Sequence, residues 1–146
     1  MRYITLAGRA LFSAIFLMAL PNHLKPATIA FAAQQGVPAA QLLVPLAGVL
    51  AFAGGASVLL GYRAKLGAWL LVAFLVPVTF TMHNFWSVSD PTMALFQQAM
   101  FVKNLAILGG ALLIASFGAG PLSLDARRAG TGGERRSRAE QGAVGV

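Results

Sequence analysis

The sequence predicts an all-α membrane protein: a polytopic bundle of four spanning helices with both termini in the cytoplasm. Three observations lead to this fold class. Apolar residues make up 58% of the 146 residues, charged residues make up only 10%, and the apolar residues fall in long runs. A soluble domain carries about 25% charged residues, so a cytosolic globular enzyme and a disordered chain are both excluded. The absence of cysteine excludes disulfides and thiolate metal sites.

Four segments are long and apolar enough to cross a bilayer, which takes about 20 residues in a helix. They are residues 4–20, residues 41–60, residues 66–82 and a run centred on residues 101–117. Pro21 ends the first segment, and the short turn Gly61–Lys65 makes the second and third antiparallel neighbours. Asp90 is a candidate N-cap for the fourth helix, with Pro91 at its first position. Residues 1–120 therefore form one four-span domain.

The basic residues predict the orientation. With both termini cytoplasmic, all but Lys25 and Lys103 of the 11 Lys and Arg residues lie inside, in accordance with the positive-inside rule. Residues 21–40 form an outer loop that can hold a short helix on the membrane surface. Residues 121–146 are rich in Gly, Arg and Glu and read as a disordered basic cytoplasmic tail. Nucleic-acid binding is not expected, because no aromatic residue is interleaved with the basic ones.

Small residues and a proline predict how the spans pack. Gly54-Gly55 and Gly109-Gly110 lie inside apolar helices, where they let neighbouring helices approach closely. Pro77 is expected to kink the third span and to free a carbonyl that nearby threonines re-satisfy.

A group of polar residues at the outer end of the third and fourth spans is the predicted substrate-binding site. Its members are His83, Asn84, Gln97, Lys103 and Asn104. Gln97 lies seven residues before Asn104, and therefore on the same helix face. The group either binds a small-molecule headgroup or joins helices by hydrogen bonds. Two histidines and one nearby carboxylate are too few ligands for a metal, so no metal site is expected.

Arg9 is the sixth candidate binding residue, about a turn and a half into the first span. A charge at this depth costs a few kcal/mol unless it reaches water or a partner. One interpretation is that the long side chain extends to the inner interface. The other is that it lies inside the bundle and binds an anionic group or a carbonyl oxygen.

Between residues 5 and 125 the chain carries a series of short motifs. In chain order they are Arg9, Lys25-Pro26, Gln35-Gly36-Val37-Pro38, Gly54-Gly55, Leu60-Gly61-Tyr62-Arg63, His83 with Phe85-Trp86, Gln97 to Phe101, Lys103-Asn104-Leu105-Ala106 and Ser123-Leu124-Asp125. With these motifs the chain resembles the DoxX family of small four-helix membrane proteins of bacteria and archaea. The resemblance implies a multi-pass protein of the bacterial inner membrane and a role as membrane subunit of a quinone-linked oxidoreductase.

Two functions follow as expectations. In the first, a quinone is held by the outer polar residues, and a redox partner protein supplies the electron carrier that this chain lacks. In the second, the chain is a non-catalytic membrane scaffold or lipid-handling subunit. The absence of any Asp or Glu within the four spans favours the second. A small-solute transporter ranks last, because four spans enclose a pathway only in a homo-oligomer. The lipid bilayer is the partner common to all three.

Overall fold

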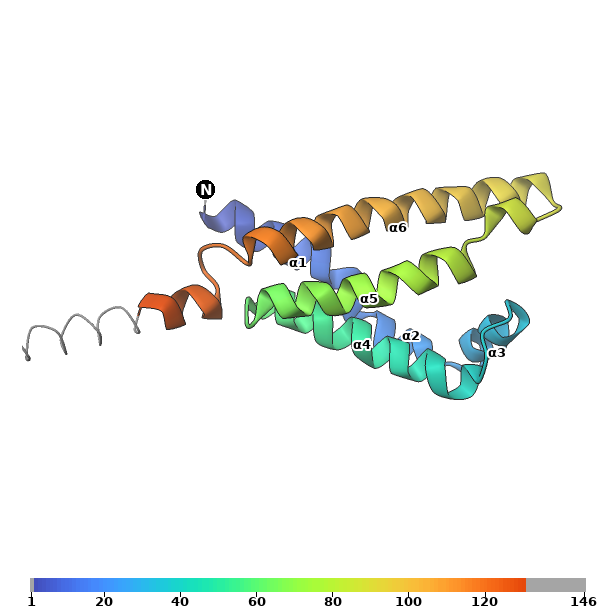
Figure 1. The fold of residues 1–146 in the computed structure, drawn as a ribbon, viewed down its shortest axis with the longest axis horizontal. Helices are drawn as coiled ribbons and strands as arrows, with labels where there is room; N and C mark the ends of the chain where they lie inside the picture. The colour runs from blue at the N-terminus through green and yellow to red at the C-terminus, as the bar shows by residue number, and fades with distance from the viewer. Residues whose placement is uncertain (1, 131–146) are drawn as a thin grey trace, which may run out of the picture.

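The four-span bundle is confirmed by a computed structural model, which describes residues 2–130 (Figure 1). Its helices are α1 (Arg2–Leu17), α2 (Ala19–His23), α3 (Pro26–Gln34), α4 (Ala40–Leu60), α5 (Ala64–Met82), the short 3-10 helix η1 (Phe85–Ser87) and α6 (Pro91–Phe117). Taking α1 with α2 as one span and α5 with η1 as another, four helical segments are long and apolar enough to cross a membrane. The side on which the termini lie stays a prediction.

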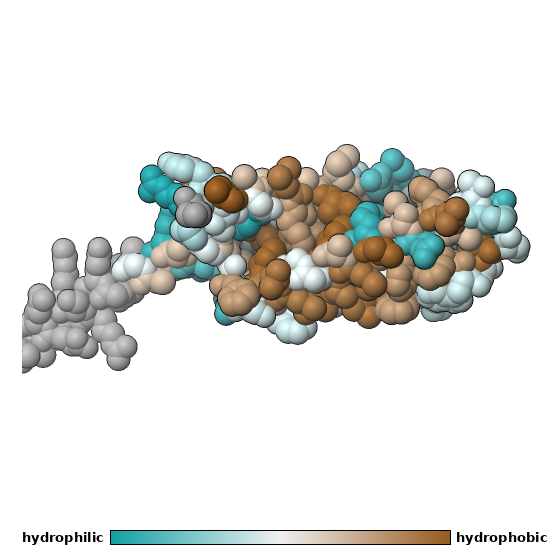
Figure 2. Space-filling model, turned by 90° about the horizontal axis from the view of Figure 1, so that it is seen from above, coloured by the Kyte–Doolittle hydropathy of each residue, from teal (hydrophilic) through white to brown (hydrophobic). Residues whose placement is uncertain are grey.

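The bundle has two distinct ends. We call the end that holds the α4–α5 turn and residues 118–130 the basic end, and the end that holds α3 and η1 the α3 end (Figure 1). Figure 2 shows hydrophilic atoms gathered at the basic end, an apolar belt along the middle and separate hydrophilic patches nearer to the α3 end. At ~1.5 Å per residue, the 21 residues of α4 span about 31 Å, close to the thickness of a bilayer's hydrocarbon core.

A break at Met18 divides the first span into α1 and α2. Pro21 lacks the N–H group that would bond to the carbonyl of Leu17, so the helical ladder is interrupted where α1 ends. Lys25 then precedes α3, which starts with Pro26 at its first position. The short helix expected within residues 21–40 is therefore present.

Helix α3 packs onto the start of α4. It ends at Gln34, and Gly36 follows with a φ of +84°, a conformation that glycine adopts without a Cβ penalty. The N–H of Val37 bonds back to the carbonyl of Ala32 at 3.1 Å. Ala32 is buried in a small cluster with Ala40 and Val44 of α4. The chain thus folds back on itself and places α3 over the ends of the spans.

Glycines set the close approach of α4 to its neighbours. A Cβ added at Gly54 would lie 2.7 Å from Leu71 Cδ2 and 2.9 Å from the backbone oxygen of Gly67 on α5. A Cβ added at Gly55 would lie 2.7 Å from Phe16 Cβ on α1. Side chains at either position would push the helices apart, so the predicted packing role of this glycine pair is confirmed.

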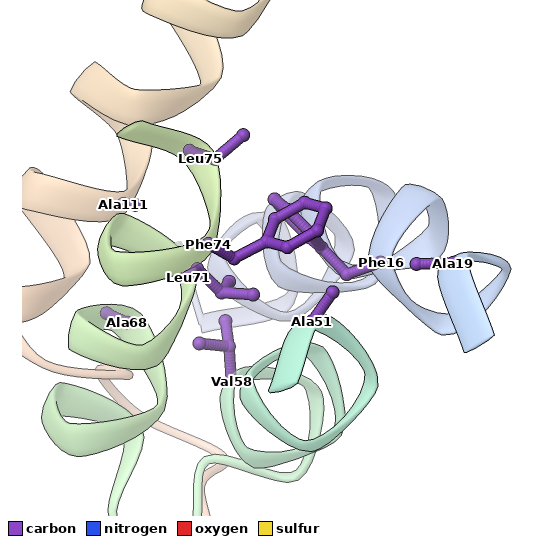
Figure 3. Packing of buried hydrophobic residues seen from close by; sticks show 9 residues of the cluster. All are labelled: Phe16, Ala19, Ala51, Val58, Ala68, Leu71, Phe74, Leu75 and Ala111. Atoms are coloured by element: carbon purple, nitrogen blue, oxygen red, sulfur yellow. The ribbon is translucent and has the colours of Figure 1, made fainter. Parts of the chain in front are cut away.

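The main apolar core lies where α1, α4 and α5 meet (Figure 3). The ring of Phe74 on α5 points toward Phe16 on α1, and the two rings meet edge to face at 6.3 Å between centroids. Leu71 and Val58 are fully buried beside them. Alanines from three helices, Ala51, Ala68 and Ala111, belong to the same buried cluster and let the helices approach one another.

Helix α6 is packed mainly along α5. Within the described residues only Asn104 and Ala111 of this helix are buried. Gly110 faces Phe12 of α1, with 3.0 Å from an added Cβ to Cε2, whereas Gly109 has no neighbour within 4 Å. Of the second glycine pair, therefore, Gly110 fits the packing role inside this chain and Gly109 does not.

Pro77 lies within α5 without ending it. The hydroxyl of Thr79 donates to the carbonyl of Leu75 at 2.6 Å, and that of Thr81 donates to the carbonyl of Pro77 itself at 2.7 Å. The carbonyl left without its helical donor is that of Ala73, four residues before the proline. The prediction that nearby threonines bond to the freed carbonyl is therefore wrong, because Thr79 and Thr81 bond to other carbonyls.

Residues just beyond α6 are folded against the basic end, and residues 124–130 are helical. Ser123 precedes this helix, donates from its hydroxyl to the carbonyl of Gly120 at 2.7 Å and accepts from the N–H of Ala126 at 3.1 Å. The tail predicted to be disordered was residues 121–146; residues 124–130 are helical instead, and residues 131–146 lie outside the described part of the chain.

Candidate functional site

His83 and Gln97 form the one direct contact within the predicted outer group. Asp90 caps α6, as expected, by accepting the N–H of Met93 at 2.7 Å. The helix then carries Gln97 to the level of His83, and the two side chains are hydrogen-bonded at 2.8 Å between Nδ1 and Oε1. The amide oxygen only accepts, so Nδ1 donates in this arrangement. The pair links the end of α5 to α6.

The other members of the group point in different directions. Asn104 is buried, with 6% of its surface exposed, whereas Lys103 is exposed and its Nζ lies 3.5 Å from Met100 Sδ. Successive residues of a helix are turned by about 100°, so these two cannot both face the bundle. Asn84 uses its backbone carbonyl to accept from Ser87. Asn104 also lies seven residues beyond Gln97, or about 10 Å further along α6 at ~1.5 Å per residue. The five residues therefore do not come together in one cluster, and their substrate-binding role stays a prediction.

Arg9 lies at the opposite end of the bundle from this group. Its side chain is buried, with 4% exposed, and its Nη1 and Nη2 donate to the carbonyls of Ala119 and Leu122, each at 3.0 Å. Of the two interpretations left open above, the structure selects the interior one, with carbonyl oxygens as the partners. Arg9 Nε and the hydroxyl of Ser13, one turn further along α1, are buried without a partner among the described residues.

Asp125 joins the segment after α6 to the start of α5, a role that was not predicted from the sequence. Its carboxylate accepts the N–H of Arg63 at 2.8 Å and that of Ala64 at 3.0 Å, while its own N–H donates to the carbonyl of Gly61 at 2.8 Å. It therefore caps the start of α5 from a segment some 60 residues later in the chain. The signal in the sequence is weak: one acidic residue after a Ser-Leu pair.

An apolar cavity of about 520 Å³ lies between α4 and α5 beneath α3. Its walls come from α4 and α5, from His23 of α2, from α3 and from the loop after α3, and they include Leu46, Leu50 and Val78. On α5 the wall extends from Met82 at the α3 end to Ala73, about 14 Å along the helix at ~1.5 Å per residue. This is about half of a bilayer's hydrocarbon thickness, so the cavity is as deep as one lipid leaflet.

Polar atoms are few in the cavity wall. His23 lines the cavity and its Nδ1 lies 2.7 Å from the carbonyl of Ala19. Because a carbonyl only accepts, Nδ1 carries the proton, and the Nε2 of the neutral ring keeps a free lone pair. The ring packs edge to face on Phe74 at 5.7 Å. The hydroxyl-bearing residues Thr28 and Thr81 also belong to the lining. A mostly apolar cavity with a few polar groups suits an apolar ligand with a small polar head.

The cavity was not foreseen from the sequence. It arises because α3 folds back over α4 and because small residues on the facing helices leave space, and neither feature has a sequence signal of its own. Among residues 2–130, no three side chains of His, Cys, Asp or Glu gather where they could hold a metal ion.

Comparison with known proteins places the chain among membrane proteins of one family. The sequence model of the SURF4 family matches residues 1–129. The "Surfeit locus protein 4 homolog" of Schizosaccharomyces pombe is 31% identical over 127 residues, covering 86% of this chain and 38% of that relative. The "ER-derived vesicles protein ERV29" of Saccharomyces cerevisiae is 34% identical over 80 residues, covering 55% of this chain and 26% of that relative.

A relative of more similar length comes from Escherichia coli. "Inner membrane protein YqjF" is 33% identical over 90 residues, which are 62% of this chain and 63% of that protein. The matches therefore span from about a quarter to under two thirds of the relatives' own lengths. No solved structure matches the chain.

These matches correct the expected family. The DoxX resemblance rested on short, separate motifs. The SURF4 family model matches the chain as a whole from residue 1 to 129, so the assignment to DoxX is wrong. The quinone-linked oxidoreductase role was implied by that resemblance and loses its support with it.

Proposed function

Since this chain belongs to the SURF4 family, we propose that it is a non-catalytic, multi-pass membrane protein that holds an apolar chain of a lipid. The observation that carries this proposal is the cavity between α4 and α5. Its volume of about 520 Å³ falls within the range of about 300–1,000 Å³ that small-molecule sites occupy. The bacterial inner membrane remains the predicted location.

The position of the cavity favours a lipid chain over a water-soluble ligand. Leu46 and Ala73 line it and are themselves exposed on the membrane-facing side of α4 and α5. The cavity therefore opens sideways toward the bilayer, where acyl chains are the available apolar molecules. His23, Thr28 and Thr81 supply the few polar groups among mostly apolar walls, and Nε2 of a neutral His23 ring is an acceptor. A lipid-binding role is compatible with relatives named for ER-derived vesicles and for an inner membrane.

Photo-crosslinking tests the proposal. The protein is reconstituted with a phospholipid that carries a diazirine near the middle of one acyl chain, irradiated, and digested for mass spectrometry. We expect adducts to concentrate on Leu46, Leu50 and Val78, and the lipid to remain with the protein through detergent exchange. Adducts spread evenly over the outward faces of all four spans would refute the proposal and leave a scaffold with ordinary boundary lipid.

A pair of matched variants separates cavity binding from general lipid contact. Ala73→Phe places a ring at the cavity, whereas Ala106→Phe places the same ring at an exposed position on α6. We expect the first to lower the amount of retained lipid and the second to leave it unchanged. Equal retention in the two variants would contradict a lipid in this cavity.

A further inference from the structure

A second hollow lies at the basic end, away from the apolar cavity. It is a groove of about 680 Å³ between the start of α5 and the segment that follows α6. Arg63, Lys65 and Leu66 line one side, and the other side is lined by Phe117 to Gly120 together with Ser123, Asp125 and Ala126. The groove thus combines two cationic side chains with apolar residues at its rim.

The groove is electropositive in spite of its one carboxylate. Asp125 already accepts two backbone N–H groups at the start of α5, where the helix dipole offsets negative charge. Lys65 donates from Nζ to the carbonyl of Ser116 at 2.8 Å, so its ammonium is held at the end of α6 beside the groove. Arg63 is exposed on the turn that opens α5. Two unit positive charges therefore face one carboxylate whose charge is partly offset.

The depth of the groove matches the headgroup region of a bilayer. It lies at the level where α5 begins and α6 ends, just outside the apolar parts of both spans. Its rim residue Phe117 is 82% exposed and Leu66 is 54% exposed, so apolar side chains face the membrane next to the cations. Trp69 follows Leu66 by one helical turn on α5 and is 56% exposed. A molecule that fits this arrangement has an anionic head and an apolar chain.

We propose that this groove binds the headgroup of an anionic phospholipid, with the phosphodiester beside Lys65 and Arg63 and an acyl chain running along Leu66 toward Trp69. The site goes beyond the proposed function, because it lies at the other end of the bundle and selects a lipid by head charge. Basic residues next to a membrane surface each strengthen attraction to anionic lipid by about fivefold. Two of them predict a preference of up to about 25-fold over a zwitterionic lipid.

The two tryptophans give one reporter at each end of the bundle. Trp86→Phe leaves Trp69 near the groove, and Trp69→Phe leaves Trp86 at the α3 end. Each variant is reconstituted in phosphatidylcholine vesicles that contain a minor fraction of brominated lipid, which quenches nearby indoles. We expect brominated phosphatidylglycerol to quench Trp69 more than brominated phosphatidylcholine does at the same mole fraction, and both lipids to quench Trp86 equally.

Charge variants and salt complete the test. In the Trp86→Phe background, the pair Arg63→Gln and Lys65→Gln removes the excess quenching of Trp69, whereas Lys65→Arg keeps it. High ionic strength also removes the excess in the unaltered groove, because the Debye length falls from about 10 Å at 0.1 M to about 3 Å at 1 M salt. The salt dependence is measured with Arg63 and Lys65 in place, so it tests the proposal even if the double variant does not fold.

Four results would overturn the assignment. The first is equal quenching of Trp69 by both lipids. The second and third are excess quenching by phosphatidylglycerol that survives in the folded double variant or persists at high salt. The fourth is excess quenching that is abolished by inorganic phosphate but not by sodium chloride of equal ionic strength. The last result would identify a site for a soluble anion.

Discussion

The two Gly-Gly pairs allow a steric contribution to stability to be measured directly. Gly54→Ala and Gly109→Ala make the same chemical change in the interior of two spanning helices. At Gly54 the new methyl group would lie 2.7 Å from Leu71 Cδ2 and 2.9 Å from the backbone oxygen of Gly67, whereas at Gly109 nothing lies within 4 Å. The side chain of Leu71 can rotate away, but the backbone oxygen of Gly67 cannot. Carbon–oxygen contacts lie at about 3.3–3.6 Å, so α4 and α5 must move apart by about 0.4 Å or more.

The expected magnitude follows from two effects. Replacing Gly by Ala in a helix interior gains about 1 kcal/mol from helix propensity, and this gain is common to both variants. Overpacking costs about 1–3 kcal/mol, and only Gly54→Ala incurs it, because the backbone oxygen of Gly67 cannot rotate away as a side chain can. The difference between the two variants is therefore the steric effect alone, about 1–3 kcal/mol, or about five- to 150-fold in the unfolding equilibrium constant.

Titration with sodium dodecyl sulfate in mixed micelles measures this difference. Unfolding is followed by tryptophan fluorescence, and circular dichroism in the mild detergent alone shows whether each variant starts with native helix content. We expect Gly109→Ala to unfold at a higher denaturant fraction than the unaltered protein, and Gly54→Ala at a lower fraction than Gly109→Ala. Coinciding midpoints for the two variants would refute the close approach of α4 and α5 at Gly54.

Three further substitutions probe the polar contacts. Asp125→Asn should destabilise the protein by about 0.5–2 kcal/mol through loss of the charged cap and speed hydrogen exchange at the N–H of Arg63; unchanged exchange would contradict the cap. Arg9→Lys keeps the charge but cannot donate to both carbonyls of the segment after α6. Limited proteolysis of that segment should therefore become several times faster, and equal rates in the variant and the unaltered protein would show that Arg9 does not hold it in place. Gln97→Leu should lower the free energy of unfolding by about 0.6 kcal/mol, the average for hydrogen bonds between membrane helices. It should also shift the imidazole nitrogen resonances of His83, and resonances that do not move would contradict the hydrogen bond between His83 and Gln97.

Much of the fold could be predicted from the sequence because a bilayer imposes a simple rule. Every backbone polar group in the hydrocarbon must be bonded within its own helix, so span length and apolar composition suffice to find the helices. The same applies to the start of α6, since Asp90 and Pro91 act through bonds to residues next to them in the chain. Local chemistry of this kind is readable from a single segment.

Contacts between distant segments were not readable in the same way. The sequence left Arg9 with two interpretations, because the carbonyls that it binds belong to residues beyond α6. It grouped Lys103 with Asn104 by proximity along the chain, but the helix turns one outward and the other inward. The apolar cavity forms because α3 folds back over α4, and the pattern of apolar residues in the sequence does not predict this fold-back. The span to which each residue belongs could be predicted, whereas the direction of each side chain required the packed bundle.

The contacts of Arg9 also impose an order on how the protein is assembled during its synthesis. Its two carbonyl partners come 110 and 113 residues later in the chain. At translation rates of about 5–20 residues per second, about 6–22 s pass between the synthesis of this arginine and that of its first acceptor. Until then water at the membrane surface is the alternative partner of the guanidinium, which the long side chain can reach. Among the described spans, α1 thus completes its contacts only after α6, the last of them, has been made.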